Sequence, residues 1–421
     1  MTVSLGRRRA ATFALFFLPG LAMASWVTRT PDVRDLLGAS TGRMGLVLFG
    51  LSVGSMAGIL CSGPLVARWG ARPLIAAGTL ATAAGSGIIG LGAAAGTDAV
   101  VALGLGLIGL GMGGGEVALN IEGAEVERLL GRSTLPAMHG FYSLGTVVGA
   151  VGGMTLTAVS FPVLWHLAVV TAVVVAVLVP MIRYVPAGVG RRTGSGTHAQ
   201  ASARPAVWRE PRLLLIGAII LALAMAEGTA NDWLPLVMVD GHDFDPALGS
   251  AVYAIFAASM TVGRFAGGRF VDRYGRAAAL RASAVIGAVG IALVILVDNQ
   301  AVAATAAVLW GIGASLGFPV ALSAAGDSGD NSAARVSLAA TLGYVAFLVG
   351  PPSLGQLGEH FGLRNALFLV LILVVAASFA TPAARTAHAA GTPARASGVA
   401  PRHEADCAGG SAPCCRRSGG R

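Results

Sequence analysis

The sequence contains no lysine and few charged residues of any kind. Charged residues make up 12% of the 421 residues, whereas a soluble globular protein carries roughly 25%. Aromatic residues contribute only 6%, while hydrophobic residues reach 55% and the mean hydropathy is +0.74. This composition excludes a disordered chain and disfavours an ordinary soluble enzyme. We therefore expect a membrane protein.

All 29 basic residues are arginines, and 20 acidic residues leave a net charge of +9. Most arginines lie between apolar runs and do not form one continuous patch. This distribution indicates contact with lipid headgroups and no nucleic-acid partner. The four cysteines match neither a disulfide framework nor a zinc pattern. A Walker loop and an H-E-x-x-H motif are also absent, so we expect no enzyme, no cofactor and no metal site.

Glycine is abundant, with 60 residues. The glycines of 109–114 fit a G-x-G-x-x-G dinucleotide fingerprint, but that fingerprint needs a preceding strand that this apolar run does not offer. We interpret these glycines, and Gly145, Gly149 and Gly153 at a spacing of four, as positions where membrane helices approach closely.

Apolar runs long enough for a membrane-spanning helix of about 20 residues recur along the chain. They predict an all-α polytopic membrane protein with twelve transmembrane helices in two sets. The first set covers about 10–29, 43–67, 73–95, 99–122, 136–158 and 162–183. The second covers about 212–238, 248–270, 278–297, 301–325, 335–357 and 363–382.

The predicted domains follow from this spacing. They are an N-terminal six-helix half (1–184), a polar cytoplasmic linker (185–210), a C-terminal six-helix half (211–383) and a disordered cytoplasmic tail (384–421).

The N-terminus resembles a signal peptide, because three arginines (7–9) precede an apolar stretch and Ala-Met-Ala (22–24) resembles a cleavage site. The apolar stretch continues past that site through Val27, and Leu-Ala-Met-Ala (21–24) recurs at 223–226. We interpret the stretch as a retained first membrane helix.

An internal repeat relates the two halves. The Leu-Ala-Met-Ala segments are 202 residues apart, Gly109 and Gly111 align with Gly311 and Gly313 at the same offset, and 63–70 aligns with 268–275. Six spans return the chain to its starting side, so the two halves are parallel repeats.

The distribution of arginines between the segments that connect the spans predicts the orientation of the protein in the membrane, because cytoplasmic segments carry an excess of positive charge. With a cytoplasmic N-terminus, the only arginines in outside segments are Arg29, Arg34, Arg43 and Arg364. We therefore expect a multi-pass membrane protein with both termini cytoplasmic. We also expect that the membrane is the cytoplasmic (inner) membrane of a bacterium and that the protein is monomeric.

The turn after the eighth run reads Gly-Arg-Phe-Val-Asp-Arg-Tyr-Gly-Arg (268–276) and resembles the G-x-x-x-D-R-x-G-R loop signature of the major facilitator superfamily. Segments 116–120, 139–145 and 343–352 look similar to a bacterial branch near the fucose–proton symporters. The resemblance covers about residues 8–383. It implies a transporter with alternating access about a central site between two halves.

The signature loops imply a charged gate on the cytoplasmic face. The first copy has Ala67 where the signature has aspartate, so we expect the gate to rest mostly on the second copy. The alternative is a pair of tight turns with positive-inside charge. The predicted gate residues are Gly63, Arg68, Gly70, Arg72, Gly268, Asp272, Arg273, Gly275 and Arg276.

Three acids, Glu116, Glu227 and Asp232, fall within predicted spans, where an ionised side chain is costly and needs a reason. Glu116 and Glu227 are the predicted proton-coupling residues. An acid on the fourth helix serves protonation in the symporter branch, although the acid of that branch's first helix is absent here. The alternative is a structural hydrogen bond between helices.

The substrate cavity is predicted from polar and aromatic side chains near those acids. Asn120 at i+4 is expected to hold the Glu116 carboxyl, and His139 to pair with Glu122 or Glu125 as a gate element. Interfacial or core aromatics and a loop histidine without function are the alternatives. The cavity set is Asn120, Asn231, Asp232, Trp26, Tyr142 and Tyr344.

Together these features predict a secondary active transporter that carries a small polar, sugar-like solute coupled to protons. Proton-antiport efflux of hydrophobic or cationic compounds is the alternative within transport. A non-transporting membrane sensor or scaffold is the alternative of another class. The predicted partners are a small-molecule substrate, protons and the lipid bilayer.

Overall fold

The apolar runs form helices throughout the residues described by the computed structural model, which are 4–131, 134–191, 209–328 and 332–385. The N-terminal helix group contains α1 (Leu5–Val27), α2 (Thr30–Leu37), α3 (Thr41–Trp69), α4 (Ala71–Ala94), α5 (Asp98–Leu130), α6 (Leu135–Ala158) and α7 (Val163–Ile182). The C-terminal helix group contains α9 (Pro211–His242), α10 (Pro246–Tyr274), α11 (Arg276–Leu296), α12 (Gln300–Ala314), α13 (Gly317–Gly326), α14 (Ser332–Phe361), α15 (Leu363–Ala380) and the 3-10 turn η1 (Thr381–Ala384).

Twelve stretches are long and apolar enough to span a membrane, and the described residues contain no β-strand. The predicted all-α polytopic fold is therefore confirmed. The tenth span, 300–326, is divided into α12 and α13. α5 continues to Leu130, beyond the predicted end at 122. The charged residues of its last turns form ion pairs, Glu122 with Arg8 and Glu125 with Arg128, which support this polar extension of the helix. The short helix α2 was not predicted.

The two predicted signature loops are tight junctions between helices. Gly70 separates α3 from α4 with φ of 87°, and Gly275 separates α10 from α11 with φ of 81°. A side chain at a positive φ would be strained, so both junctions require glycine. The same conformation at repeat-related positions agrees with the predicted internal repeat.

Glycines bring α1 and α6 into backbone contact, as the spacing of four predicts. A Cβ atom at Gly145 would lie 2.2 Å from the Phe17 carbonyl oxygen, and one at Gly149 would lie 2.5 Å from the Leu21 carbonyl oxygen. At Gly153 a Cβ atom would collide with the Thr28 hydroxyl. Small residues at such interfaces allow the close packing that holds helices together in lipid.

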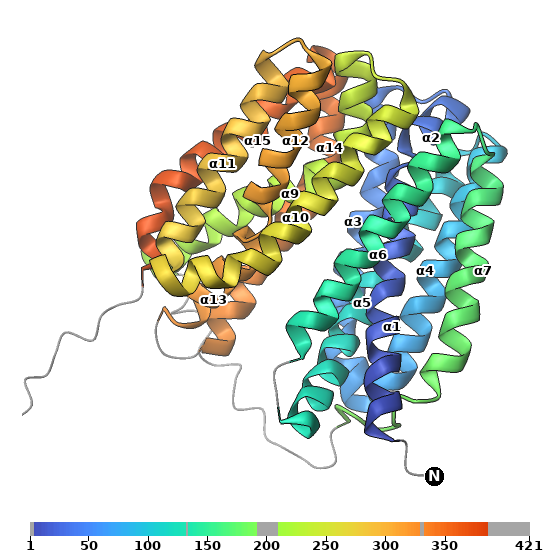
Figure 1. Ribbon diagram of the computed structural model, residues 1–421, viewed down its shortest axis with the longest axis vertical. Helices are drawn as coiled ribbons and strands as arrows, with labels where there is room; N and C mark the ends of the chain where they lie inside the picture. The colour runs from blue at the N-terminus through green and yellow to red at the C-terminus, as the bar shows by residue number, and fades with distance from the viewer. Residues whose placement is uncertain (1–3, 132–133, 192–208, 329–331, 386–421) are drawn as a thin grey trace, which may run out of the picture. The chain divides into compact units, whose positions relative to one another are not determined.

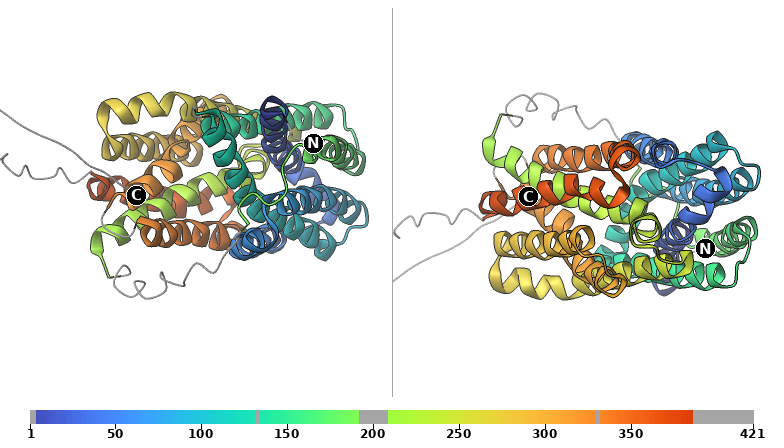
Figure 2. Two further views of the ribbon diagram at one scale, coloured as in Figure 1. Left: turned by 90° about the horizontal axis from the view of Figure 1, so that it is seen from below. Right: turned by 90° about the horizontal axis from the view of Figure 1, so that it is seen from above.

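The two helix groups lie side by side, with α3 against α14 and α6 against α10 (Figures 1 and 2). We call the end that contains α2 the outer end and the opposite end, where α1 begins, the inner end; the inner end is the predicted cytoplasmic one. Figure 1 shows the ribbons of the two groups meeting at the outer end and diverging toward the inner end.

The hydrogen bonds that link the groups lie between the outer end and the middle of the helices. The Gly42 N–H donates to Glu359 Oε2 at 2.7 Å, and Arg34 pairs with Asp240. The bonds nearer the middle are Ser250 Oγ to the Thr28 carbonyl at 2.7 Å and Ser52 Oγ to the Phe347 carbonyl at 2.6 Å. At the α6–α10 contact, Phe265 also lies against Gly140.

The predicted linker and tail fall mostly on 192–208 and 386–421, which lie outside the described residues. The division into a linker and a tail therefore stays a prediction.

Replacing Gly149 by valine is expected to destabilise the protein by about 1–3 kcal/mol, because the new side chain meets the α1 backbone. Gly152→Val is the matched control, since it places the same side chain on α6 where no heavy atom lies within 4 Å. Thermal unfolding in detergent measures both variants. Equal melting temperatures would contradict the close α1–α6 contact.

Candidate functional site

An ion pair joins two helices of the C-terminal group within the membrane-spanning segments. Arg264 Nη2 on α10 donates to Glu227 Oε1 on α9 at 2.7 Å. The side chains are 31% and 14% exposed, so both are partly removed from solvent. The opposite charges of the two side chains offset part of the unfavourable transfer of each away from water.

Glu116 on α5 lies across from this pair, in the N-terminal group. The charges of Arg264 and Glu227 act on its carboxyl, and the carboxyl in turn acts on Tyr142 and Tyr344. Glu116 is exposed although it belongs to a membrane-spanning segment. Solvent therefore reaches the space between the groups at this level.

These five residues form what we call the central cluster. They come from five helices of both groups, so any relative movement of the groups changes their spacing. The cluster consists of Glu116 (α5), Tyr142 (α6), Glu227 (α9), Arg264 (α10) and Tyr344 (α14).

The hydrogen bonds next to the cluster differ from the predicted ones. Asn120 Oδ1 accepts from His139 Nε2 at 2.9 Å, so Asn120 holds this ring and not the Glu116 carboxyl. Glu122 pairs with Arg8 of α1 at 2.6 Å, and both side chains are buried. The predicted pairing of His139 with Glu122 or Glu125 is therefore wrong.

Both Glu122 and Glu125 form ion pairs with arginines instead of with His139. Arg8 reaches Glu122 from the neighbouring helix α1, while Arg128, one turn away on α5, pairs with Glu125 at 2.6 Å. A guanidinium with two N–H groups aimed at one carboxylate competes better for it than a single imidazole does.

The remaining cavity candidates divide into partly exposed and buried residues. Tyr253 donates to Asn231 Oδ1 at 3.2 Å, and the ring of Tyr344 packs at 6.3 Å from that of Phe318. Trp26 and Asp232 are buried in the core, and Asp232 is 7% exposed. Within the described residues no hydrogen bond or ion pair reaches Asp232.

The predicted gate residues lie at the inner end. Arg276 meets the terminus of a neighbouring helix, where it pairs with Asp327 after α13 at 2.5 Å. Asp272 is exposed and has no ion-pair partner among the described residues. The guanidinium of Arg68 lies over the ring of Trp69, and that of Arg273 over Tyr274. Gly63 and Gly268 have open space around them. In this conformation these charges do not bridge the two groups.

Arg264 is the site residue that sequence reasoning missed. It was counted among the inside arginines that set the orientation, as if it belonged to a loop. Its position ten residues before the end of α10 places it inside the eighth apolar run. An arginine inside a span, opposite an acid in another span, is the signal that identifies it.

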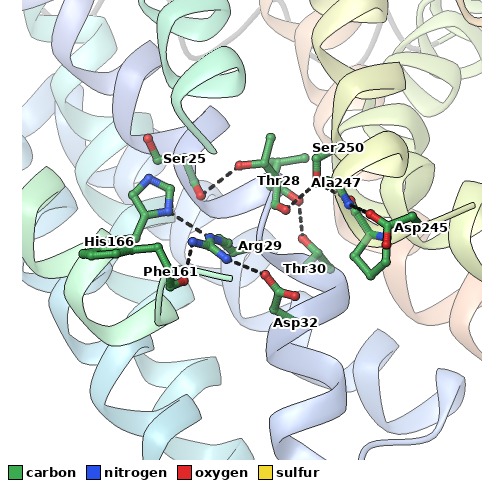
Figure 3. Close-up of polar contacts among 12 residues, drawn as sticks. Ser25, Thr28, Arg29, Thr30, Asp32, Phe161, His166, Asp245, Ala247 and Ser250 are labelled. Carbon is green, nitrogen blue, oxygen red and sulfur yellow. Dashed lines mark hydrogen bonds and ion pairs between the residues drawn. The ribbon is translucent and has the colours of Figure 1, made fainter. Parts of the chain in front are cut away.

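Another buried charge lies near the outer end (Figure 3). Arg29, which follows α1, is 2% exposed and donates to His166 Nδ1 at 3.0 Å, to Asp32 at 2.7 Å and to the Phe161 carbonyl at 2.7 Å. The neighbouring Thr28 carbonyl accepts the Ser250 hydroxyl of the other group. Arg29 thus fixes the segment that carries a contact between the groups.

Charged groups from both helix groups that meet at solvent within a bundle of membrane-spanning helices define a membrane transporter. The Major Facilitator Superfamily model matches residues 11–351, and this chain belongs to that family. It is 32% identical over 377 residues to an uncharacterised MFS-type transporter of Yersinia pestis, covering 88% of this chain and 94% of the relative.

Solved structures share the fold at low sequence identity. A mutant of the nucleoside transporter NupG aligns with a TM-score of 0.73 at 14% identity over 90% of this chain and 99% of that chain. A variant of the Escherichia coli fucose–proton symporter FucP aligns with a TM-score of 0.62 at 14% identity over 91% and 99%. The predicted resemblance to this superfamily, with fucose–proton symporters among its neighbours, is confirmed.

Removing the Arg29 side chain is expected to destabilise the protein by about 2–4 kcal/mol, because Arg29→Ala leaves the Phe161 carbonyl and the buried His166 ring without their donor. Arg43→Ala is the matched control, since its ion pair with Asp98 is largely exposed and is worth under about 1 kcal/mol. Thermal unfolding of both variants checks this. An equal loss in the two would contradict the structural role of Arg29.

Proposed function

We propose that this transporter carries a small polar, sugar-like solute together with protons, by alternating access about the central cluster. The observation that carries the proposal is the position of Glu116. Glu116 is a solvent-exposed residue within a membrane-spanning segment, opposite the ion pair of the other group. A carboxyl without a fixed partner at this depth has reason to bind a proton before its surroundings close.

Glu227 is the second proposed coupling residue, because its ion pair with Arg264 can break when either the proton or the solute takes one partner. The hydroxyl and amide groups that surround the pair would bind the solute. They belong to Tyr142, Tyr344, Asn120 and Asn231.

The conformation described here is linked at the outer end, so the proposed cycle requires those links to break and the inner end to close. We propose that the loop residues around Arg68 and Asp272 bridge the groups in that opposite state. A bacterial inner-membrane location, cytoplasmic termini and a monomeric carrier are part of the proposal.

A second function is favoured by the charge of the cluster. Two carboxyls face one guanidinium, and this negative excess suits a cationic substrate exchanged for protons. Symport and antiport move protons in opposite directions relative to the solute, whereas a sensor without transport would move none.

Substrate candidates are identified first by thermal stability in detergent with a panel of sugars, polyols, carboxylates and lipophilic cations. A ligand present at 100 times its dissociation constant adds about 2.7 kcal/mol to the folded state. The solute with the largest shift is then used in proteoliposomes.

Glu116→Gln is expected to abolish solute-driven proton uptake, read by a pH dye inside proteoliposomes, while exchange of labelled solute across the membrane continues. Glutamine keeps the side-chain shape but cannot carry the proton. Glu125→Gln is the matched control on the same helix, because Glu125 pairs with Arg128 at its inner end. Proton uptake that persists in Glu116→Gln would overturn the assignment of Glu116.

The gate assignment predicts unequal effects of the two loops. Asp272→Asn is expected to slow net uptake by about tenfold, the value of one lost charge-assisted hydrogen bond. Arg68→Ala should slow uptake less, because the first loop has Ala67 in place of the aspartate. Initial uptake rates at equal protein amounts measure both. A larger loss in Arg68→Ala would reverse the assignment.

A further inference from the structure

The guanidinium of Arg264 has N–H groups that the fold does not use. Glu227 takes one of them, through a single bond from Nη2 to Oε1, and no other hydrogen bond of Arg264 occurs within the described residues. A buried structural arginine behaves differently in this same protein. Arg8 makes two bonds to Glu122, and Arg29 uses three of its nitrogen atoms.

The unused side of Arg264 faces solvent within the bundle. The side chain is 31% exposed, and its charge acts on Glu116, Tyr142 and His139, all of which belong to the other helix group. Arg264 thus presents free donors to the space between the groups, at the level where a solute would bind.

A planar guanidinium with adjacent free N–H groups matches one ligand chemistry better than others. A carboxylate accepts two parallel hydrogen bonds from it, and such bonds are roughly twice as strong as those between neutral groups. A neutral sugar hydroxyl gains less from the same donors and leaves the positive charge poorly solvated. The hydroxyl and amide groups nearby suit a solute that also carries hydroxyls.

We propose that the transported solute is a hydroxylated monocarboxylate, whose carboxylate binds Arg264 while the proton resides on Glu116. This inference rests on the proposed proton-coupled transport and specifies the substrate class of the same site.

The charges of the cluster support this pairing. Without solute, ionised Glu116 and Glu227 with Arg264 leave one net negative charge, which repels an anion. A proton on Glu116 removes that excess and permits the carboxylate to approach Arg264. The loaded cluster then carries one net negative charge again, as the empty cluster does. The empty and loaded carriers therefore cross between conformations with equal charge.

This balance explains coupling without a direct bond between proton and solute. An anion alone would add a second negative charge to the cluster, so this half-loaded state is disfavoured relative to the fully loaded one. Binding of the carboxylate is therefore linked to protonation of Glu116. Transport of a monocarboxylate with one proton is electroneutral.

The test uses galactose and two of its derivatives, each changed at one position. Galacturonate has a carboxylate at C6 and galactosamine an ammonium group at C2, so the three probes share a ring and most hydroxyls but carry a negative, zero and positive charge at neutral pH. Further pairs of monocarboxylates and their neutral amides, gluconate and gluconamide among them, extend the panel. We expect carboxylate members to raise the melting temperature of the full-length protein in detergent and their neutral counterparts to raise it less.

Variants at Arg264 connect the effect to this residue. Arg264→Gln is expected to weaken carboxylate binding by roughly tenfold to a hundredfold, and Arg264→Lys to restore part of it. Arg269→Gln is the matched control, because it removes one positive charge from the same helix at an exposed position. Melting without ligand shows whether each variant is folded.

The outcomes separate this inference from the proposed function. Stabilisation only by neutral or cationic probes, or by no carboxylate at all, overturns the carboxylate assignment. Equal carboxylate binding by Arg264→Gln and the unchanged protein also overturns it. The proposed proton coupling fails separately, if a bound solute of any class moves across proteoliposome membranes without protons.

For a carboxylate that does bind, uptake driven by an inward proton gradient should be unaffected by a potassium diffusion potential clamped with valinomycin. A rate that changes with this potential would contradict the balance of charges.

Discussion

An ionised group within a membrane is costly unless the fold supplies a partner or access to solvent, and this constraint accounts for most of the charged residues inside the helix bundle. Arg8 with Glu122, Arg29 with Asp32 and His166, and Arg264 with Glu227 all satisfy it. The arginines of the first two are buried and each make two or three hydrogen bonds, so they fix helices within the N-terminal group. The third is incompletely engaged and reaches solvent. The same electrostatic requirement therefore separates pairs that hold the fold from the pair that is free to exchange partners.

Glycine has the complementary role, because it sets where backbones touch. Within the N-terminal group it joins α1 to α6, and it lets α3 approach α5, where a Cβ at Gly54 would lie 2.0 Å from the Gly106 carbonyl oxygen. Such contacts make each group rigid without bulky side chains. Rigid groups joined by a few hydrogen bonds between the outer end and the middle of the helices are suited to move as bodies, which is how a family member is expected to expose its site to each side in turn.

The sequence was sufficient for the fold and for four of the five residues of the central cluster. Length, apolar runs and the repeat define the twelve spans, because only a helix satisfies its backbone within lipid. Glu116 and Glu227 stand out as acids inside those spans. Arg264 was missed because arginine counting treats every arginine near a span end as a loop charge. The partner of Glu122 depends on how α1 and α5 are rotated about their axes, and that of His139 on how α5 and α6 are, to within part of a turn; hydropathy does not encode these rotations.

The contact of α3 with α14 at the outer end has a thermodynamic consequence. A Cβ atom at Gly45 would lie 2.9 Å from Gly355 Cα, so backbone meets backbone there with no side chain between them. Separating these surfaces frees few rotamers and exposes little hydrocarbon, and the heat-capacity change of the separation at this contact should be correspondingly small. The enthalpy and entropy of opening this seam should then vary little with temperature, so the logarithm of the equilibrium constant between the two orientations should be close to linear in reciprocal temperature. The enthalpy of a few polar links, such as the one between Gly42 and Glu359, contributes to its slope.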